Sequence, residues 1–172
     1  GYKGRALVAM DELPYIGSKP FIQASQVNAI AFYKDGPIRI LKGTEWDRIN
    51  NEVQKAFLEN SFAISLEADR MGYRIIPKES ITIDEPIQLI SEAVTFGTIQ
   101  MPPNGEPIIL MADRQTTGGY PKIGQVIAAD LHRLAQLGPK QKIEFQVVSI
   151  EEAEHLYEKL EKGLRSLELI LK

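Results

Sequence analysis

The sequence predicts a mainly β protein, a β-rich α+β fold with few helices. Two observations carry this prediction. Most apolar runs are short, alternate with polar residues and are separated by glycine, proline and asparagine turns, which is typical of strands in half-buried sheets. Helical spacing of apolar residues is clear in only a few segments, and the longest of these covers residues 150–171.

Size and composition limit the classes of partner. The 172 residues fit one domain, so we expect a single domain across residues 1–172. The net charge of −3 attracts neither nucleic acid nor an anionic membrane, and neither is expected as a partner. Cysteine is absent and no apolar run could span a bilayer, which favours a soluble, cytoplasmic protein. Because the chain begins at Gly1 inside a segment of folded character, we expect it to be the C-terminal part of a longer polypeptide.

The first forty residues are predicted to form short strands and loops. Strands are expected at residues 5–10, 28–33 and 38–41, each an apolar run flanked by turn residues. Residues 13–26 are expected to be a long loop, because two prolines and a glycine interrupt any regular element there.

A helix is predicted to follow Thr44, a residue type suited to an N-cap. Its apolar residues recur at helical spacing, at Trp46, Ile49, Val53, Ala56 and Phe57. Trp46 is the only tryptophan, and we expect it to anchor this helix on the sheet rather than to stack on a ligand.

The middle of the chain is predicted to be rich in strands. Residues 62–66 alternate between apolar and polar, and further strands are expected at residues 81–85 and 86–90. Residues 98–101 and 107–111 should pair as a hairpin, because the Pro-Pro-Asn-Gly segment between them is strongly turn-forming.

The C-terminal third adds two strands and two helices. Strands are predicted at residues 125–128 and 142–148, with a short helix capped by Asp130 between them. Ser149 opens a capping box for the long final helix. We expect that helix to pack against its own domain, with docking of a partner along its narrow apolar stripe as the alternative.

Polar residue types concentrate between residues 91 and 124. The second hairpin strand leads through Asp113 into Gln115, Thr116, Thr117, Gly118, Gly119 and Tyr120. Adjacent glycines allow backbone N–H groups to approach a ligand, and hydroxyls, an amide and a phenol lie beside them. A glycine pair alone is more often a tight barrel corner, but the density of polar types here favours a binding site.

Two carboxylates flank this stretch, Glu92 and Asp113, and both are candidates for an acid or a base. Exposed or ion-paired acids are far more common than catalytic ones, so the structural alternative stays open. Thr116 and Thr117 would need a neighbouring base to act as nucleophiles, and the sequence shows none.

Several other chemistries are disfavoured. The two histidines, His132 and His155, lie on different predicted helices without a zinc motif, so no metal is expected. Gly119 and Gly124 have the spacing of a phosphate-binding loop, but glutamine and valine follow where lysine and a hydroxyl are needed. The chain also lacks the Ala-Met-Lys-Met sequence of a biotin carrier.

Three segments carry a resemblance to a known family. The run IQMPPNGEPIILMADRQTTGGYPKI at residues 99–123 closely resembles the carboxyltransferase-domain family called allophanate hydrolase subunit 2. The DRMGYR segment at residues 69–74 and residues 129–137 resemble it too. Within the family, the chain is most similar to the branch known as KipA, the 5-oxoprolinase subunit designated C. Members are about twice this long, and Ala68-Asp69 stands where Asn or Ser often precedes the arginine.

The resemblance implies a cyclophilin-like β-barrel with peripheral helices. It also implies that the full protein acts with 5-oxoprolinase subunits A and B in the ATP-dependent opening of 5-oxoproline to glutamate. ATP would be used by the complex, and this chain itself is expected to bind no cofactor. The fragment without its N-terminal half is expected to be inactive. Two alternatives remain. The first is a regulatory protein that antagonises an inhibitor of a sporulation kinase, where that inhibitor resembles the partner subunit designated B. The second is a urea-carboxylase-type carboxyltransferase.

The resemblance also suggests roles for the polar residues. Arg70 would hold the substrate carboxylate, and Gln100 and Gln115 would bond the lactam. The segment from Thr116 to Tyr120 would stabilise charge that develops on the amide oxygen, because a lactam is a poor electrophile unless donors face that oxygen. The full predicted site consists of Arg70, Glu92, Gln100, Asp113, Gln115, Thr116, Thr117, Gly118, Gly119 and Tyr120.

Overall fold

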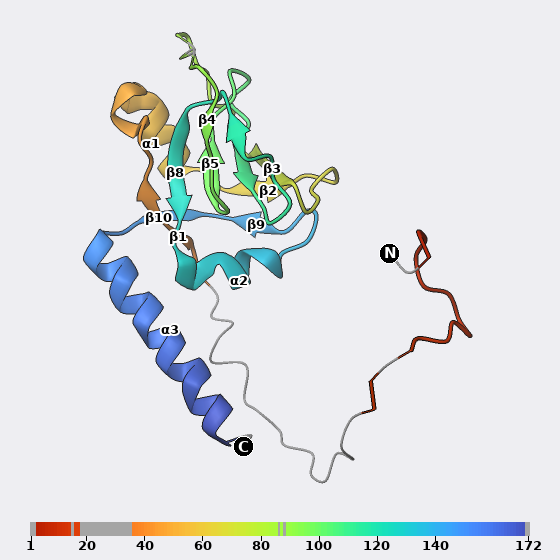
Figure 1. The fold of residues 1–172 in the computed structure, drawn as a ribbon. Helices are drawn as coiled ribbons and strands as arrows, with labels where there is room; N and C mark the ends of the chain where they lie inside the picture. Colours follow the sequence, from red (N-terminus) through yellow and green to blue (C-terminus); the bar gives the residue numbers. More distant parts are fainter. Residues whose placement is uncertain (1–2, 15, 18–35, 86, 88, 171–172) are drawn as a thin grey trace.

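The computed structural model describes residues 3–14, 16–17, 36–85, 87 and 89–170, with side chains as far as residue 166 (Figure 1). Eight strands form one sheet: β1 (Ile38–Lys42), β2 (Phe62–Ile64), β3 (Gly72–Pro77), β5 (Thr98–Gln100), β6 (Ile108–Leu110), β8 (Lys122–Val126), β9 (Lys142–Ile143) and β10 (Phe145–Val147). The predicted strand at residues 28–33 and most of the loop at residues 13–26 lie outside the described residues.

The sheet curls into a nearly closed barrel. Its strand order is β10-β1-β8-β5-β6-β3-β2-β9, so β9 and β10 stand at its two edges. These edge strands are consecutive in the chain and are separated only by Glu144. Neighbouring strands are antiparallel except β1 and β10, which are parallel. The mainly β barrel with peripheral helices is therefore confirmed.

Alternation along the strands fills the barrel with apolar side chains. Ile75, Ile99 and Ile109 of three neighbouring strands are fully buried, whereas the residues on either side of Ile75 and Ile109 face outward or are only partly covered. The hairpin of β5 and β6 is confirmed, with Ile99 opposite Ile109. The turn between them places Gly105 at a φ of +75°, a conformation that glycine adopts readily.

An aromatic cluster forms part of the core. Phe57 on helix α1 (Asn51–Glu59) stacks on Phe145 at a centroid distance of 4.9 Å and an interplanar angle of 14°. Phe62 lies 5.4 Å and Trp46 lies 6.0 Å from the Phe57 ring. Trp46 is 1% exposed, so its predicted role as an anchor on the barrel is confirmed.

The first helix starts later than predicted. Trp46 belongs to a separate 3-10 helix, η2 (Trp46–Arg48), and the chain is extended at Ile49 before α1 begins. Asn50 is the N-cap of α1, because its Oδ1 accepts a hydrogen bond of 2.7 Å from the backbone N–H of Val53. The prediction of Thr44 as the cap was wrong because helical spacing alone cannot detect this break.

Several predicted strands are also wrong. Residues 5–10 form no strand: Arg5 makes an isolated bridge, residues 6–8 have no regular structure and residues 9–10 form a turn, where Asp11 accepts hydrogen bonds from Arg5 and from the backbone of Val8. The described residues among 81–90 form no strand, because they pair with none of the strands of the sheet. The strand predicted at residues 62–66 ends at Ile64, and the one at residues 125–128 ends at Val126. Both shortenings occur where the pairing with a neighbouring strand stops.

Asp130 precedes α2 (Leu131–Ala135) as predicted, but its side chain does not cap that helix. The carboxylate is fully buried, accepts hydrogen bonds from Arg39 and contacts Arg133 at 3.1 Å. Burial by itself raises the pKa of Asp130, but the hydrogen bonds from Arg39 and the charge of Arg133 outweigh it and hold the pKa below its ordinary range. Asp130 thus ties the segment before α2 to β1.

The long final helix, α3 (Ile150–Ile170), begins as predicted at Ser149, whose Oγ accepts a hydrogen bond from the backbone N–H of Glu152. Its first half packs against the barrel, and its second half runs away from it (Figure 1). The contact consists of Ala153, Leu156 and Leu160 against Ile127, Ala129 and Val148. Among the described residues, no helix has the length and apolar character needed to cross a bilayer.

Candidate functional site

The polar stretch singled out in the sequence lies on the outside of the barrel. Glu92 and Ala93 form β4, which pairs with β7 (Thr117–Gly118) in a separate two-stranded ribbon. The backbone N–H of Val94 donates to the carbonyl of Thr116 at 3.0 Å and extends this pairing. The ribbon therefore holds the Gln-Thr-Thr-Gly-Gly-Tyr segment in a defined place.

A cavity of about 380 Å³ lies between this segment and the sheet. Its floor is the outer face of β3, β5 and β6, since the intervening residues of these strands point into the core. Its walls include the segment from Gln115 to Tyr120. The lining consists of Glu67, Asp69, Met71, Gly72, Arg74, Gln100, Ile108, Leu110, Gln115, Thr117, Gly118, Gly119 and Tyr120.

Six of the ten predicted site residues line this cavity. They are Gln100, Gln115, Thr117, Gly118, Gly119 and Tyr120. The fold brings Gln100 from β5 next to residues of the later ribbon, which its position in the sequence alone did not require. This is the grouping of an amide, hydroxyls and glycines that the sequence predicted.

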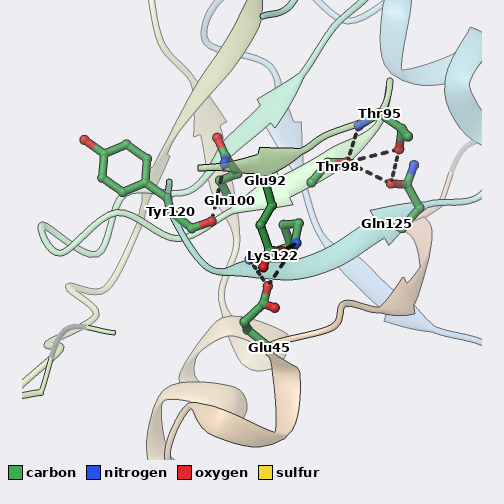
Figure 2. A network of polar contacts seen from close by, with 8 residues as sticks. All are labelled: Glu45, Glu92, Thr95, Thr98, Gln100, Tyr120, Lys122 and Gln125. Atoms are coloured by element: carbon green, nitrogen blue, oxygen red, sulfur yellow. Dashed lines mark hydrogen bonds and ion pairs between the residues drawn. The ribbon is translucent and has the colours of Figure 1, made fainter. Parts of the chain in front are cut away.

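Gln100 is the buried polar group of the cavity, with an exposed fraction of 5%. Its Nε2 donates a hydrogen bond of 3.3 Å to the backbone carbonyl of Tyr120 (Figure 2). Its Oε1 accepts no hydrogen bond from a described residue. The amide therefore has an acceptor available for a ligand, while its donor side is held by the segment that forms the wall.

Glu92 does not line the cavity but holds the ribbon in place. Its carboxylate pairs with Lys122 of β8, and Lys122 also lies 3.9 Å from Glu45 (Figure 2). The hydrogen bond and charge of Lys122 hold the pKa of Glu92 below its usual value. Glu45 is buried and accepts a hydrogen bond of 2.8 Å from the backbone N–H of Lys122. Sequence reasoning missed Glu45 and Lys122, whose only local signal is their charge.

Arg70 and Asp113 pair with each other and do not line this cavity. Arg70 Nη2 is 2.9 Å from Asp113 Oδ2, and the two side chains are 83% and 49% exposed. Arg70 borders a different hollow of about 310 Å³, together with Tyr73, Phe96 and Met111. Thr116 is exposed and does not line the cavity of Gln100.

Arg74, Glu67 and Asp69 line the cavity and were not among the predicted site residues. Arg74 follows Gly72 on β3, and Ile75 beside it points into the barrel, so strand alternation turns Arg74 outward. The signal for Arg74 was present in the sequence, because two arginines four residues apart flank Gly72. Which of the two faces the cavity depends on where β3 begins.

A larger hollow of about 540 Å³ lies elsewhere, lined by Arg48, Asn50, Ile83, Pro103, Pro121 and six neighbours. None of the predicted site residues lines it. No group of three or more histidine, cysteine, aspartate or glutamate side chains in the described parts of the chain is arranged to hold a metal ion. The cavity of Gln100 is therefore the candidate site that both the sequence pattern and the geometry support.

Two curated bacterial proteins are similar to this chain over nearly all of its length. The chain is 39% identical over 161 residues to the 5-oxoprolinase subunit designated C in Haemophilus influenzae, covering 94% of this chain and 51% of that protein. It is 38% identical over 154 residues to the subunit of the same designation in Escherichia coli, covering 89% and 49%. The chain thus spans about half the length of these curated relatives.

A solved structure and a family match extend the comparison. The Kluyveromyces lactis urea amidolyase superposes with a TM-score of 0.64 at 22% identity, over 74% of this chain and 8% of that one, which supports the shared fold. Residues 1–147 match the family described as carboxyltransferase domain, subdomain A and B. With most of its length inside that match, the chain belongs to the carboxyltransferase-domain family.

Proposed function

We propose that this chain provides the lactam-binding site of an ATP-dependent 5-oxoprolinase complex and acts there with subunits A and B. The names of the two curated relatives support the reaction. The observation that carries the proposal is the buried Gln100 amide beside Gln115 and the Gly118-Gly119-Tyr120 wall. Neither relative is named as a kinase-inhibitor antagonist or a urea carboxylase, so those alternatives gain no support.

The chemistry of the cavity suits a cyclic amide. A lactam presents one N–H donor and one carbonyl acceptor on adjacent atoms, and a glutamine amide offers the complementary pair. Gln100 and Gln115 would bind these two groups. Opening the ring places negative charge on the carbonyl oxygen, and donors that face this oxygen lower the barrier. The hydroxyls of Thr117 and Tyr120 and the backbone of the glycines are the donors in this wall.

In this proposal the chain binds and polarises the lactam, while ATP is used elsewhere in the complex. The described residues hold no phosphate-loop sequence, and the wall of the cavity presents amides, hydroxyls and backbone groups. Gly118 has no side chain and therefore leaves room for the Gln100 amide beside it. Glu92 supports the shape of the cavity indirectly, because it pairs with Lys122 and holds β4 beside β7.

The test is turnover of 5-oxoproline by the complex reconstituted with the full-length protein carrying Gln115→Ala or Tyr120→Phe. Each variant should lower kcat/KM by about 10- to 1,000-fold, because each removes a group that contacts the lactam or its developing charge. Both side chains are exposed, so the variants should fold normally.

Matched controls come from outside the cavity. Tyr157 on α3 is 46% exposed, against 45% for Tyr120, and Gln146 on β10 is exposed like Gln115. Tyr157→Phe and Gln146→Ala should leave kcat/KM unchanged. Unchanged kcat/KM in both Gln115→Ala and Tyr120→Phe would refute the proposed site.

A further inference from the structure

The cavity has an uneven distribution of charge. Among the described residues that line it, Arg74 is the only cation, and Glu67 and Asp69 are the acids. Asp69 is occupied by the backbone, since its Oδ1 accepts hydrogen bonds from Met71 N–H at 2.8 Å and Gly72 N–H at 3.1 Å. One of its two carboxylate oxygens is therefore engaged by the turn that leads to β3.

The guanidinium of Arg74 has N–H donors that are not used by the described residues. Its only ion pair with a described residue is with Glu67, at 4.0 Å between Nε and Oε2, and its guanidinium makes no hydrogen bond to a described residue. Arg74 is 53% exposed and Glu67 is 79% exposed. A pair this long and this exposed contributes little and is easily exchanged for a better partner.

Arg70 is the opposite case. Its guanidinium approaches both carboxylate oxygens of Asp113, at 2.9 and 3.3 Å. It borders a hollow lined mainly by apolar and aromatic groups, and Gln100 is not among the residues that line that hollow. To bind a ligand in the cavity of Gln100, Arg70 would have to give up its pair with Asp113.

We propose that Arg74, rather than Arg70, binds the carboxylate of the substrate, an inference that rests on the proposed function. A guanidinium offers a planar pair of donors that fits a carboxylate, and a cyclic amide with a carboxylate beside its ring nitrogen would reach Arg74 and Gln100 together. Glu67, whose Oε2 lies 4.0 Å from Arg74 Nε, stands near the place proposed for the substrate carboxylate, and the substrate would displace it.

The experiment uses the complex reconstituted with the full-length protein and two ligands, 5-oxoproline and 2-pyrrolidinone, the same lactam without the carboxylate. Arg74→Gln should raise KM for 5-oxoproline by about 10- to 100-fold, the effect of losing a charge-assisted hydrogen bond, and change kcat less. Inhibition by 2-pyrrolidinone should be unchanged. Arg74→Lys should recover part of the loss.

Arg70→Gln is the matched control, because it makes the same change four residues earlier in the chain. It should leave KM within about twofold of the wild type, since exposed ion pairs contribute little. Glu67→Gln should lower KM or leave it unchanged, because it removes the competing carboxylate. An unchanged KM in Arg74→Gln, an equal rise in Arg70→Gln, or an equal weakening of 2-pyrrolidinone inhibition would overturn the assignment of Arg74.

Calorimetric binding separates this inference from the proposed function. A wild-type complex that binds 5-oxoproline without opening it would refute the function, and the loss of that binding in Arg74→Gln would still support the carboxylate site. Turnover by the wild type with an unaltered KM in Arg74→Gln would refute only the role of Arg74. A wild-type complex that neither binds nor opens 5-oxoproline would refute both.

Discussion

Gly118 lies directly against the side-chain amide of Gln100. A Cβ atom at position 118 would stand 2.4 Å from Gln100 Nε2, closer than non-bonded atoms approach, and 3.3 Å from its Cδ, a tight contact. Gly119 beside it has more room, since a Cβ there would come no nearer than 3.6 Å to Leu89 or Ser91. The two adjacent glycines therefore differ in what limits them. Only at position 118 does the Gln100 amide leave no room for a side chain.

Gly118→Ala should displace the Gln100 amide, which is the end of a flexible side chain, and leave the barrel intact. We expect kcat/KM for 5-oxoproline to fall by about 100-fold, as for a small misplacement of a binding group, with little change in Tm. Gly119→Ala is the control and should retain most activity. Equal activity of the two alanine variants in the complex would contradict this account.

Asp130→Ala should strongly destabilise the fold. It would leave Arg39 and Arg133, which are 24% and 12% exposed, without their shared carboxylate. Breaking a buried pair in this way costs about 3–5 kcal/mol, which urea denaturation would measure. The exposed pair of Glu158 and Lys162, 3.2 Å apart on α3, is the comparison, and Glu158→Ala should cost only about 0.3–0.5 kcal/mol.

The pair of Glu92 and Lys122 should add a small dependence of stability on pH. The pKa of Glu92 is lower in the folded chain than its ordinary value of 4.5, so the pair stabilises the fold above that pH and its contribution disappears as the pH falls through the folded pKa. Glu92→Gln should lower Tm by about 2 °C at pH 7 and by less at pH 3. A difference that grows on acidification would contradict the sign.

Phe57→Ala should remove the centre of the aromatic cluster. Phe57 is fully buried and contacts the rings of Trp46, Phe62 and Phe145. Deletion of a buried phenyl ring costs about 3–5 kcal/mol. Lys55→Ala on the same helix is exposed and should change the free energy of unfolding by less than about 0.5 kcal/mol. Urea denaturation of both variants would test the prediction.

Features that depend on residues close together in the sequence were predicted correctly. The turn between β5 and β6 and the cap of α3 at Ser149 depend on residues within a few positions of each other, and both are present. The late start of α1 is also local, but its signal at Asn50 was hidden by an apolar pattern that runs continuously through η2.

Features that depend on distant partners were missed. Residues 81–85 have the alternation of a strand, yet they pair with no strand of the sheet. Asp130 and Lys122 have partners that lie 91 and 77 residues away in the chain. Whether Arg70 or Arg74 reaches the cavity is decided by the register of β3 against β6, where Arg74 faces Ile108. The register of β3 against β6 cannot be predicted from composition or from the spacing of residues.

The closure of the barrel through Glu144 has a consequence for how the chain acquires its structure. β1 pairs with β8 and β10, and β2 with β9, so strands early in the sequence wait for partners that are synthesised last. Such long-range pairing slows folding and leaves strand edges open for association with other chains. A nascent chain that ends before residue 142 would expose the edges of both β1 and β2, and these edges are covered only when the two short strands β9 and β10 emerge.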